Sequence, residues 1–197
     1  MEQFKFLNIR VVLELFCFSL LLVSCTSSEY QKRETVELAK GFRNDSLFHS
    51  IFFGMTSGDY RKHCANMNRN GVFSEGPANS AVEFTLVDLP FPSTCFFTPS
   101  FFNDRIYQVS GFVQYDAWAP WNRRLHSDSL QVDIKDMIKK WYGRDDFLII
   151  PKPNSKDYAF VFLDANRRVT ILRENEAKVR IIFRDVTIKD DELPTNE

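Results

Sequence analysis

Residues 128–143 read DSLQVDIKDMIKKWYG and carry the clearest helical period in the chain. The apolar side chains that would share one helix face are Leu130, Ile134, Met137, Ile138 and Trp141. Asp128 and Gln131 suit an N-terminal cap, and Gly143 suits the left-handed residue that follows a helix. The pattern therefore predicts one amphipathic α-helix over this stretch.

The chain that follows this helix reads as a run of short β-strands. The predicted strands are Phe147–Ile150, Asp157–Leu163, Arg168–Arg173 and Lys178–Val186. The turns between the last three strands are short enough for hairpins. At the first of these turns, Asp164–Arg167, Arg167 and Arg168 could form a small basic point with Arg184, but a polar turn with solvated charges is the favoured interpretation.

The chain before the central helix has the same order of elements. Thr56 and Asp59 have the spacing of a capping box, and Asn70-Gly71 indicates the end of a helix. The apolar positions in between are Tyr60, Cys64 and Met67. Three strands are predicted to follow, at Ala81–Val87, Cys95–Phe102 and Arg105–Tyr115, with a turn at Asn103-Asp104.

A helix followed by an antiparallel meander, twice over, predicts an α+β fold. We expect two tandem repeats, with the helices packed on one face of an antiparallel sheet. The predicted division of the chain is 47–116 for the first repeat, 117–128 for a Trp-rich linker, 129–188 for the second repeat and 189–197 for an acidic tail.

Composition excludes two broad classes of protein. The 197 residues include 25 Lys and Arg against 26 Asp and Glu, which gives a net charge of −1. A nucleic-acid-binding protein would usually have a basic excess, so no nucleic-acid partner is expected. With 44% hydrophobic residues and so little net charge, the chain is also not expected to be disordered throughout.

Residues 1–24 have the pattern of a secretory signal peptide. Lys5 and Arg10 precede the apolar run 11–23, which is too short to cross a bilayer comfortably as a helix. The run ends in Leu22-Val23-Ser24-Cys25, which resembles the lipobox of bacterial lipoproteins. The resemblance implies cleavage before Cys25, lipidation of its thiol, and a mature chain held on a membrane by its acyl chains.

Residues 25–46 are then predicted to be a lipidated, largely polar tether. The acidic signal that some bacteria place behind the cysteine for surface export is weak here, since only Glu29 is close. We therefore expect a bacterial cell-envelope protein, anchored by lipid in the outer membrane and facing the periplasm.

Several short motifs are distributed over the mature chain. They are Phe52-Phe53-Gly54-Met55-Thr56, His63-Cys64 with Asn68, Trp118-Ala119-Pro120-Trp121-Asn122, Lys140-Trp141-Tyr142-Gly143 and Asn166-Arg167-Arg168. Together, over about residues 48–186, they resemble a family of uncharacterised lipoproteins from Bacteroidota, which brings no established activity. The Gly-Met-Thr helix start and the doubled order also resemble the beta-lactamase inhibitor protein and small outer-membrane assembly lipoproteins. That second resemblance is architectural and implies no function.

The remaining cysteines leave two alternatives open. Once Cys17 is removed with the signal peptide and Cys25 is lipidated, Cys64 and Cys95 are left. In an oxidising envelope these two could form one disulfide. They could equally remain free thiols that behave as small apolar residues.

No catalytic or cofactor-binding pattern is found in the sequence. Residues 54–58 resemble the G-x-S-x-G nucleophile elbow only superficially and are better explained as a helix start. His49, His63 and His126 have no paired spacing. We therefore predict no catalytic residue, no metal site and no cofactor, and expect that the protein is not an enzyme.

The linker carries the strongest candidate for binding. The candidate interaction residues are Tyr115, Trp118, Trp121, Asn122, Arg123 and Arg124. Trp and Arg of this kind dominate binding hot spots, but the favoured interpretation is that both Trp rings fill the junction between the repeats, with the binding hypothesis gaining if the indoles are exposed.

Two functions remain in consideration. The first is a non-catalytic interaction or scaffold module with a protein partner in the envelope. The alternative is an enzyme or a binder of small ligands or cell-wall glycans, with Tyr142, His126 and Asp116 in a cleft between the repeats.

Overall fold

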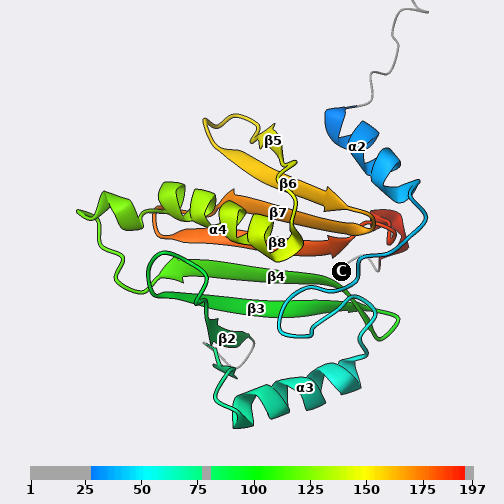
Figure 1. The fold of residues 1–197 in the computed structure, drawn as a ribbon, viewed down its shortest axis with the longest axis horizontal. Helices are drawn as coiled ribbons and strands as arrows, with labels where there is room; N and C mark the ends of the chain where they lie inside the picture. Colours follow the sequence, from blue (N-terminus) through cyan, green and yellow to red (C-terminus); the bar gives the residue numbers. More distant parts are fainter. Residues whose placement is uncertain (1–27, 77–80, 194–197) are drawn as a thin grey trace, which may run out of the picture. The chain divides into compact units, whose positions relative to one another are not determined.

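The computed structural model describes residues 28–76 and 81–193 (Figure 1). Contacts divide the chain into two units, residues 1–32 and residues 33–197. In the first unit, the Ser28 N–H donates to Gln31 Oε1 (2.8 Å) and the Gln31 N–H donates to Ser28 Oγ (3.2 Å). This reciprocal pair is a capping box that begins helix α2 (Glu29–Leu38). The predicted signal peptide, 1–24, and Cys25 lie outside the described residues.

The second unit contains one eight-stranded antiparallel sheet, in the order β1-β2-β3-β4-β8-β7-β6-β5. Its strands are β1 (Ser74–Glu75), β2 (Val82–Thr85), β3 (Ser93–Phe102), β4 (Arg105–Tyr115), β5 (Leu148–Pro151), β6 (Tyr158–Asp164), β7 (Arg167–Arg173) and β8 (Lys178–Asp185). Strands consecutive in the chain are neighbours in each half, and β4 pairs with β8 to join the halves, with Val109 opposite Phe183. The α+β class predicted from the sequence is confirmed.

Helix α4 (Ser127–Tyr142) lies over one face of the sheet, against β7, β8 and β4 (Figure 1). Its apolar side chains Leu130, Ile134, Met137 and Ile138 are buried, as the sequence period predicts. Gly143 closes the helix with a φ of 70°, a left-handed conformation that glycine adopts without steric cost. The helix begins at Ser127, so Ser127 and Asp128, the last two residues of the predicted linker, belong to the helix.

Helix α3 (Ser57–Arg69) begins as predicted but packs differently. Thr56 Oγ1 accepts the Asp59 N–H (3.1 Å) and donates to the Asp59 carboxylate (2.9 Å). Only Tyr60 is buried, because the apolar face of this helix is narrow. Helix α3 lies beyond the β2 edge in Figure 1 and does not cover the sheet. The prediction of helices packed on one face therefore holds for α4 alone.

The β3–β4 hairpin explains an irregular sequence pattern. Asn103 and Asp104 form its turn with φ values of 48° and 59°, in agreement with the predicted turn. The register shifts between Ser100 and Phe101, because Ser100 lies opposite Gln108 and Phe101 lies opposite Ile106. Tyr107 is therefore an extra residue in β4, which is why apolar alternation in this strand is imperfect.

Residues 33–46 are not a free tether, contrary to the sequence prediction. Glu37 is 2% exposed, and the Asn44 N–H donates to Asn166 Oδ1 (2.7 Å) across 122 residues of chain. Ser46 also pairs with Phe52 in an isolated β-bridge. The polar sequence of this segment predicts a solvated chain. In the structure, its polar side chains instead form hydrogen bonds with one another and with the β6–β7 turn.

Candidate functional site

The segment between β4 and α4, residues 116–126, forms an ordered loop that we call the Trp loop. Backbone N–H groups donate to carbonyl oxygens within it, from Asn122 to Ala119 (2.9 Å) and from Leu125 to Asn122 (3.0 Å). Trp121 projects from these turns with 85% of its surface exposed. A large aromatic side chain held out by an ordered backbone is preorganised for contact with another molecule.

Arg123 and Arg124 are exposed beside Trp121, and so is Asn122. The Arg124 guanidinium lies 5.5 Å from the centre of the Phe91 ring, which holds it by a cation–π contact. Of the predicted interaction residues, these four are accessible on the surface.

Tyr115 is not an interaction residue, contrary to the sequence prediction. It is 1% exposed, and its hydroxyl donates to Asp133 Oδ2 (2.6 Å) on α4. Burial and the Asp133 carboxylate both raise the pKa of this hydroxyl. As the last residue of β4, Tyr115 alternates toward the helix and so joins the core.

Trp118 is half-buried and fills the base of the Trp loop. Its ring lies 5.9 Å from that of His126, whose Nε2 is 3.1 Å from the Pro120 carbonyl oxygen. Among the described residues, no acceptor is found for the buried Trp118 indole N–H. The two Trp residues thus have different roles, since Trp118 supports the loop from which Trp121 projects.

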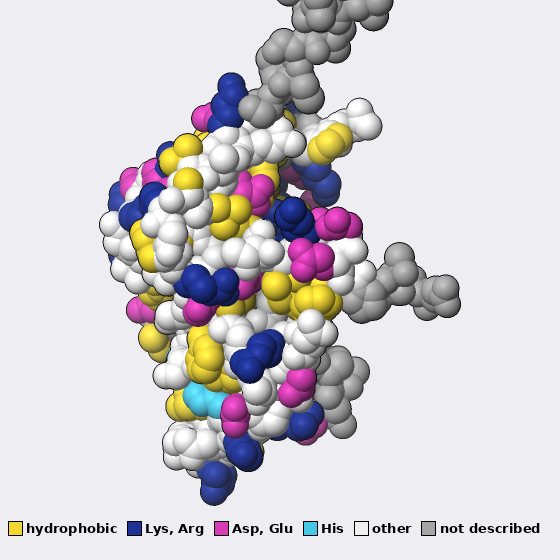
Figure 2. Space-filling view, turned by 90° about the vertical axis from the view of Figure 1, so that its right-hand side faces the viewer, with side chains coloured by type: hydrophobic (Ala, Val, Ile, Leu, Met, Phe, Trp, Pro, Cys, Tyr) yellow, Lys and Arg dark blue, Asp and Glu magenta, His cyan; other side chains and the backbone are white. Residues whose placement is uncertain are grey.

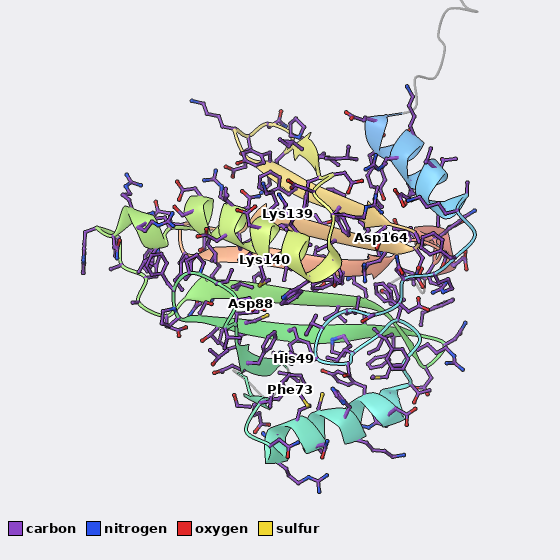
Figure 3. The ribbon with its side chains drawn as sticks, in the orientation of Figure 1. His49, Phe73, Asp88, Lys139, Lys140 and Asp164 are labelled. Atoms are coloured by element: carbon purple, nitrogen blue, oxygen red, sulfur yellow. The ribbon has the colours of Figure 1, made fainter. Side chains whose placement is uncertain are left out.

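A cleft of about 660 Å³ opens at the other end of α4. Its walls come from residues 44–50, the loop after β2, the last turn of α4 and the β6–β7 turn. Three of its lining residues, His49, Asp88 and Asp164, are labelled in Figure 3. Trp141 lies half-buried on one wall, where its indole N–H donates to Asp88 Oδ2 (2.8 Å).

The wall formed by residues 46–52 is a tight turn. The Leu47 N–H donates to the Ile51 carbonyl (2.9 Å), and the Ile51 N–H donates to the Phe48 carbonyl (2.8 Å). His49 and Ser50, between them, have φ values of 46° and 62°. This left-handed backbone is costly for residues other than glycine, so the surrounding contacts must hold it.

Side chains from the second half of the chain hold that turn. The Tyr142 hydroxyl donates to the Leu47 carbonyl (3.0 Å), and Arg167 Nη1 donates to the Ser46 carbonyl (2.6 Å). The His49 ring packs edge-on against Phe84 (4.8 Å between centroids) and Phe73 (5.4 Å). Partial burial lowers the pKa of the His49 imidazole and the neighbouring His63 lowers it further, against a smaller opposite effect of Asp88.

Of the three residues that the alternative hypothesis places in a cleft, one lines this cleft and two lie elsewhere. Tyr142 lines this cleft, whereas His126 and Asp116 belong to the Trp loop at the opposite end of α4. Asp116 accepts a hydrogen bond from the Thr94 hydroxyl (2.7 Å). The three residues proposed from sequence therefore do not converge.

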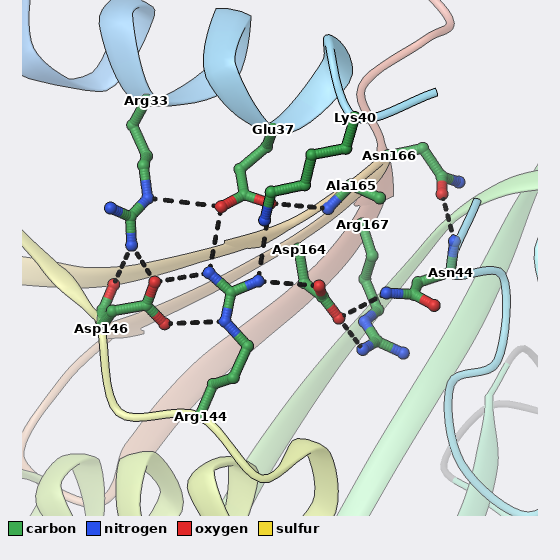
Figure 4. Close-up of polar contacts among 10 residues, drawn as sticks. All are labelled: Arg33, Glu37, Lys40, Asn44, Arg144, Asp146, Asp164, Ala165, Asn166 and Arg167. Atoms are coloured by element: carbon green, nitrogen blue, oxygen red, sulfur yellow. Dashed lines mark hydrogen bonds and ion pairs between the residues drawn. The ribbon is translucent and has the colours of Figure 1, made fainter. Parts of the chain in front are cut away.

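A network of charged side chains borders the cleft (Figure 4). Glu37 accepts hydrogen bonds from Arg144 Nη2 (3.0 Å) and the Ala165 N–H (3.1 Å), and it also pairs with Lys40. Burial alone raises the pKa of the Glu37 carboxyl, but Arg144, Lys40 and the Ala165 N–H outweigh it and lower this pKa to about 2. Glu37 is therefore ionised at neutral pH.

Asp164 extends this ion network into the β6–β7 turn. Its carboxylate accepts from Arg144 Nη1 (2.8 Å), Arg167 Nη2 (2.7 Å) and Asn44 Nδ2 (2.7 Å). Arg167 is buried and lies 3.5 Å from the centre of the Tyr142 ring. The prediction of solvated charges at Asp164–Arg167 is wrong, because residues 33–46 cover this turn. The surface at this end of the sheet intersperses basic and acidic side chains (Figure 2).

Sequence reasoning missed the ion network and anticipated only Tyr142 among the residues of this cleft. Glu37 and Arg144 are separated by 107 residues, and neither stands in a motif. The only available signal was the apolar-aromatic character of Trp141-Tyr142 at the end of an amphipathic helix.

Cys64 and Cys95 are both free thiols, so the disulfide alternative is not realised in the structure. Cys95 is buried in β3, and Cys64 lies half-buried on α3. Burial raises the pKa of both thiols. Both therefore pack as small apolar residues.

Within the described ranges, no three His, Cys, Asp or Glu side chains are grouped to hold a metal ion. The helices in these ranges are also too short or too polar to cross a membrane. No family model, curated protein or solved structure matches this chain.

Proposed function

We propose that this chain is a lipid-anchored protein of the bacterial cell envelope that binds a protein partner through the Trp loop. Its role is non-catalytic. The observation that carries the proposal is Trp121, which is 85% exposed on an ordered loop beside two exposed arginines. Exposed Trp and Arg side chains in this arrangement dominate the free energy of many protein interfaces.

The position of the Trp loop supports this proposal. Residues 33–46 join the sheet beside Arg144, which follows α4, whereas the Trp loop precedes α4. The 16 residues of α4 separate these sites by about 24 Å. If Cys25 is lipidated as the lipobox resemblance implies, the chain enters the domain at one end and presents Trp121 at the other.

The order of the elements also supports the proposal of two tandem repeats. Each half consists of one helix followed by four strands, and the last strands of the two halves pair. Such a duplication would place the Trp loop at the junction between the repeats. The different positions of α3 and α4 would then reflect divergence of the helices.

The partner is tested by crosslinking from single positions in native membranes. A photoreactive residue at Trp121 should give a discrete adduct with another protein. The matched control is Ile149, which is also exposed but lies on the edge strand β5. Equal adducts from both positions, or none from Trp121, would contradict the proposed interface.

The anchor is tested separately with Cys25→Ala. We expect this variant to leave the membrane fraction, while wild type stays in it. Retention of Cys25→Ala in the membrane would contradict lipid anchoring and leave the Trp121 test unaffected.

A further inference from the structure

We propose that the cleft between residues 44–50 and the last turn of α4 binds a neutral sugar ring. This site is independent of the Trp loop and lies at the opposite end of α4. Its volume of about 660 Å³ falls within the usual range for small-ligand sites, which is roughly 300–1,000 Å³.

The cleft is preformed, because both of its main walls are fixed by hydrogen bonds. Arg167 and Tyr142 hold the backbone carbonyls of Ser46 and Leu47. Asp88 fixes the plane of the Trp141 indole through its N–H. The left-handed backbone at His49 and Ser50 adds a second observation, since strain of this kind clusters at binding sites.

The chemistry of the lining combines aromatic surface with hydrogen-bonding groups. Phe48, Phe84 and Trp141 supply the apolar part, and the Phe48 ring stacks on Phe84 (5.6 Å) with Trp141 beyond it (6.4 Å). Asn44, Ser46, Ser50, Thr85 and Asp88 supply the polar groups. A sugar ring has one apolar face and a rim of hydroxyls, so it can satisfy both kinds of surface at once.

The charges of the lining residues argue against an anionic ligand. Arg167 is the one cation among them, and it is buried and already donates to Asp164 and the Ser46 carbonyl. Asp164 is balanced by Arg144 and Arg167. Asp88 is exposed and carries a carboxylate that can accept hydroxyl hydrogens.

An organic cation is less well suited than a sugar. A cage for a quaternary ammonium needs aromatic faces arranged around an open space. Here Phe48 and Phe84 stack on each other, so these two rings line the cleft as one apolar surface and do not surround an open space.

The test uses Trp141 as its own reporter. The chain has three tryptophans, so a Trp118→Phe/Trp121→Phe variant leaves Trp141 as the sole one. Two probes are titrated, N,N′-diacetylchitobiose for cell-wall glycan chemistry and cellobiose for glycans without N-acetyl groups. We expect at least one to shift the Trp141 emission with a Kd of about 1 mM. The preferred probe identifies the glycan source.

Asp88→Ala should weaken that binding about tenfold or more, since it removes an acceptor for the sugar hydroxyls. Asp136→Asn is the control, because Asp136 is exposed on α4 and does not line the cleft. Wild-type chain, followed by its amide resonances at residues 46–50 and 85–88, provides the same titration without any substitution.

Three results would overturn the proposal. One is no change with either sugar up to about 10 mM in both titrations. Another is binding that Asp88→Ala leaves unchanged. The third is a response to tetramethylammonium or to glucuronic acid that exceeds the response to the neutral sugars. None of these outcomes depends on whether Trp121 contacts a protein.

Discussion

The two ends of α4 differ in how the chain uses its polar and aromatic side chains. At the C-terminal end, Glu37, Arg144 and Asp164 are drawn into one network with little exposure of the acids. At the N-terminal end, Trp121, Arg123 and Arg124 stay in solvent. Ion pairs thus fix residues 33–46 at the C-terminal end of α4, whereas at the N-terminal end the Trp121 side chain is exposed and its burial does not stabilise the fold. Substitutions at the two ends should separate stability from binding.

The largest effect on stability is expected from Arg144→Met. This change leaves Glu37 and Asp164 without their shared cation in a buried setting, which should cost about 3 kcal/mol or more of unfolding free energy. Chemical denaturation measures the loss. Arg180→Met is the control, since its pair with Glu174 is more exposed and should contribute at most about 1 kcal/mol. Equal losses in both variants would contradict the buried network.

Acid should weaken the same end of the molecule next. The pKa of Glu37 is about 2 in the folded chain against 4.5 for a free carboxyl, so its contribution is present above pH 4.5 and is lost as the pH falls toward 2. The loss should be on the order of 2 kcal/mol. This loss is measured by comparing the denaturation midpoints of wild type and Glu37→Gln at about pH 6 and about pH 3. A steeper fall in Glu37→Gln than in wild type would contradict the assignment.

A smaller loss is expected from Tyr115→Phe. It removes the hydroxyl that donates to Asp133 and should cost about 1 kcal/mol, because one hydrogen bond is lost while the ring stays packed. Thermal unfolding measures the change, with Tyr107→Phe as the control for removal of a hydroxyl elsewhere in β4. A stable Tyr115→Phe variant with reduced partner crosslinking would return Tyr115 to the binding surface.

The smallest effect on stability is expected from Trp121→Ala. With 85% of its surface exposed, this side chain has little to lose on truncation, and the change should stay within about 0.5 kcal/mol. Circular dichroism melts check this. A loss well above 1 kcal/mol would mean that Trp121 packs in solution, and the contrast between the two ends would disappear.

The elements that the sequence predicts well are those decided by local pattern. The spacing of Leu130, Ile134, Met137 and Ile138 predicts α4, and Asn103-Asp104 predicts the hairpin turn. The two-residue strand β1 is missed because it is too short to have a period.

Long-range polar contacts could not be predicted in the same way. Glu37 resembles any surface acid of a polar segment until the fold brings Arg144 and Ala165 to it. For this reason the polar sequence of residues 25–46 predicts a tether, although residues 33–46 pack on the domain. The cleft is equally invisible to local pattern, because its walls come from four separate segments of the chain.

The strand order also has a consequence for self-association. Both outer strands of the sheet are short, with two residues in β1 and four in β5. The last residue of β5 is Pro151, which has no N–H to offer to a neighbouring strand. At β1 and β5 a second copy would therefore find only a short backbone edge with which to extend the sheet.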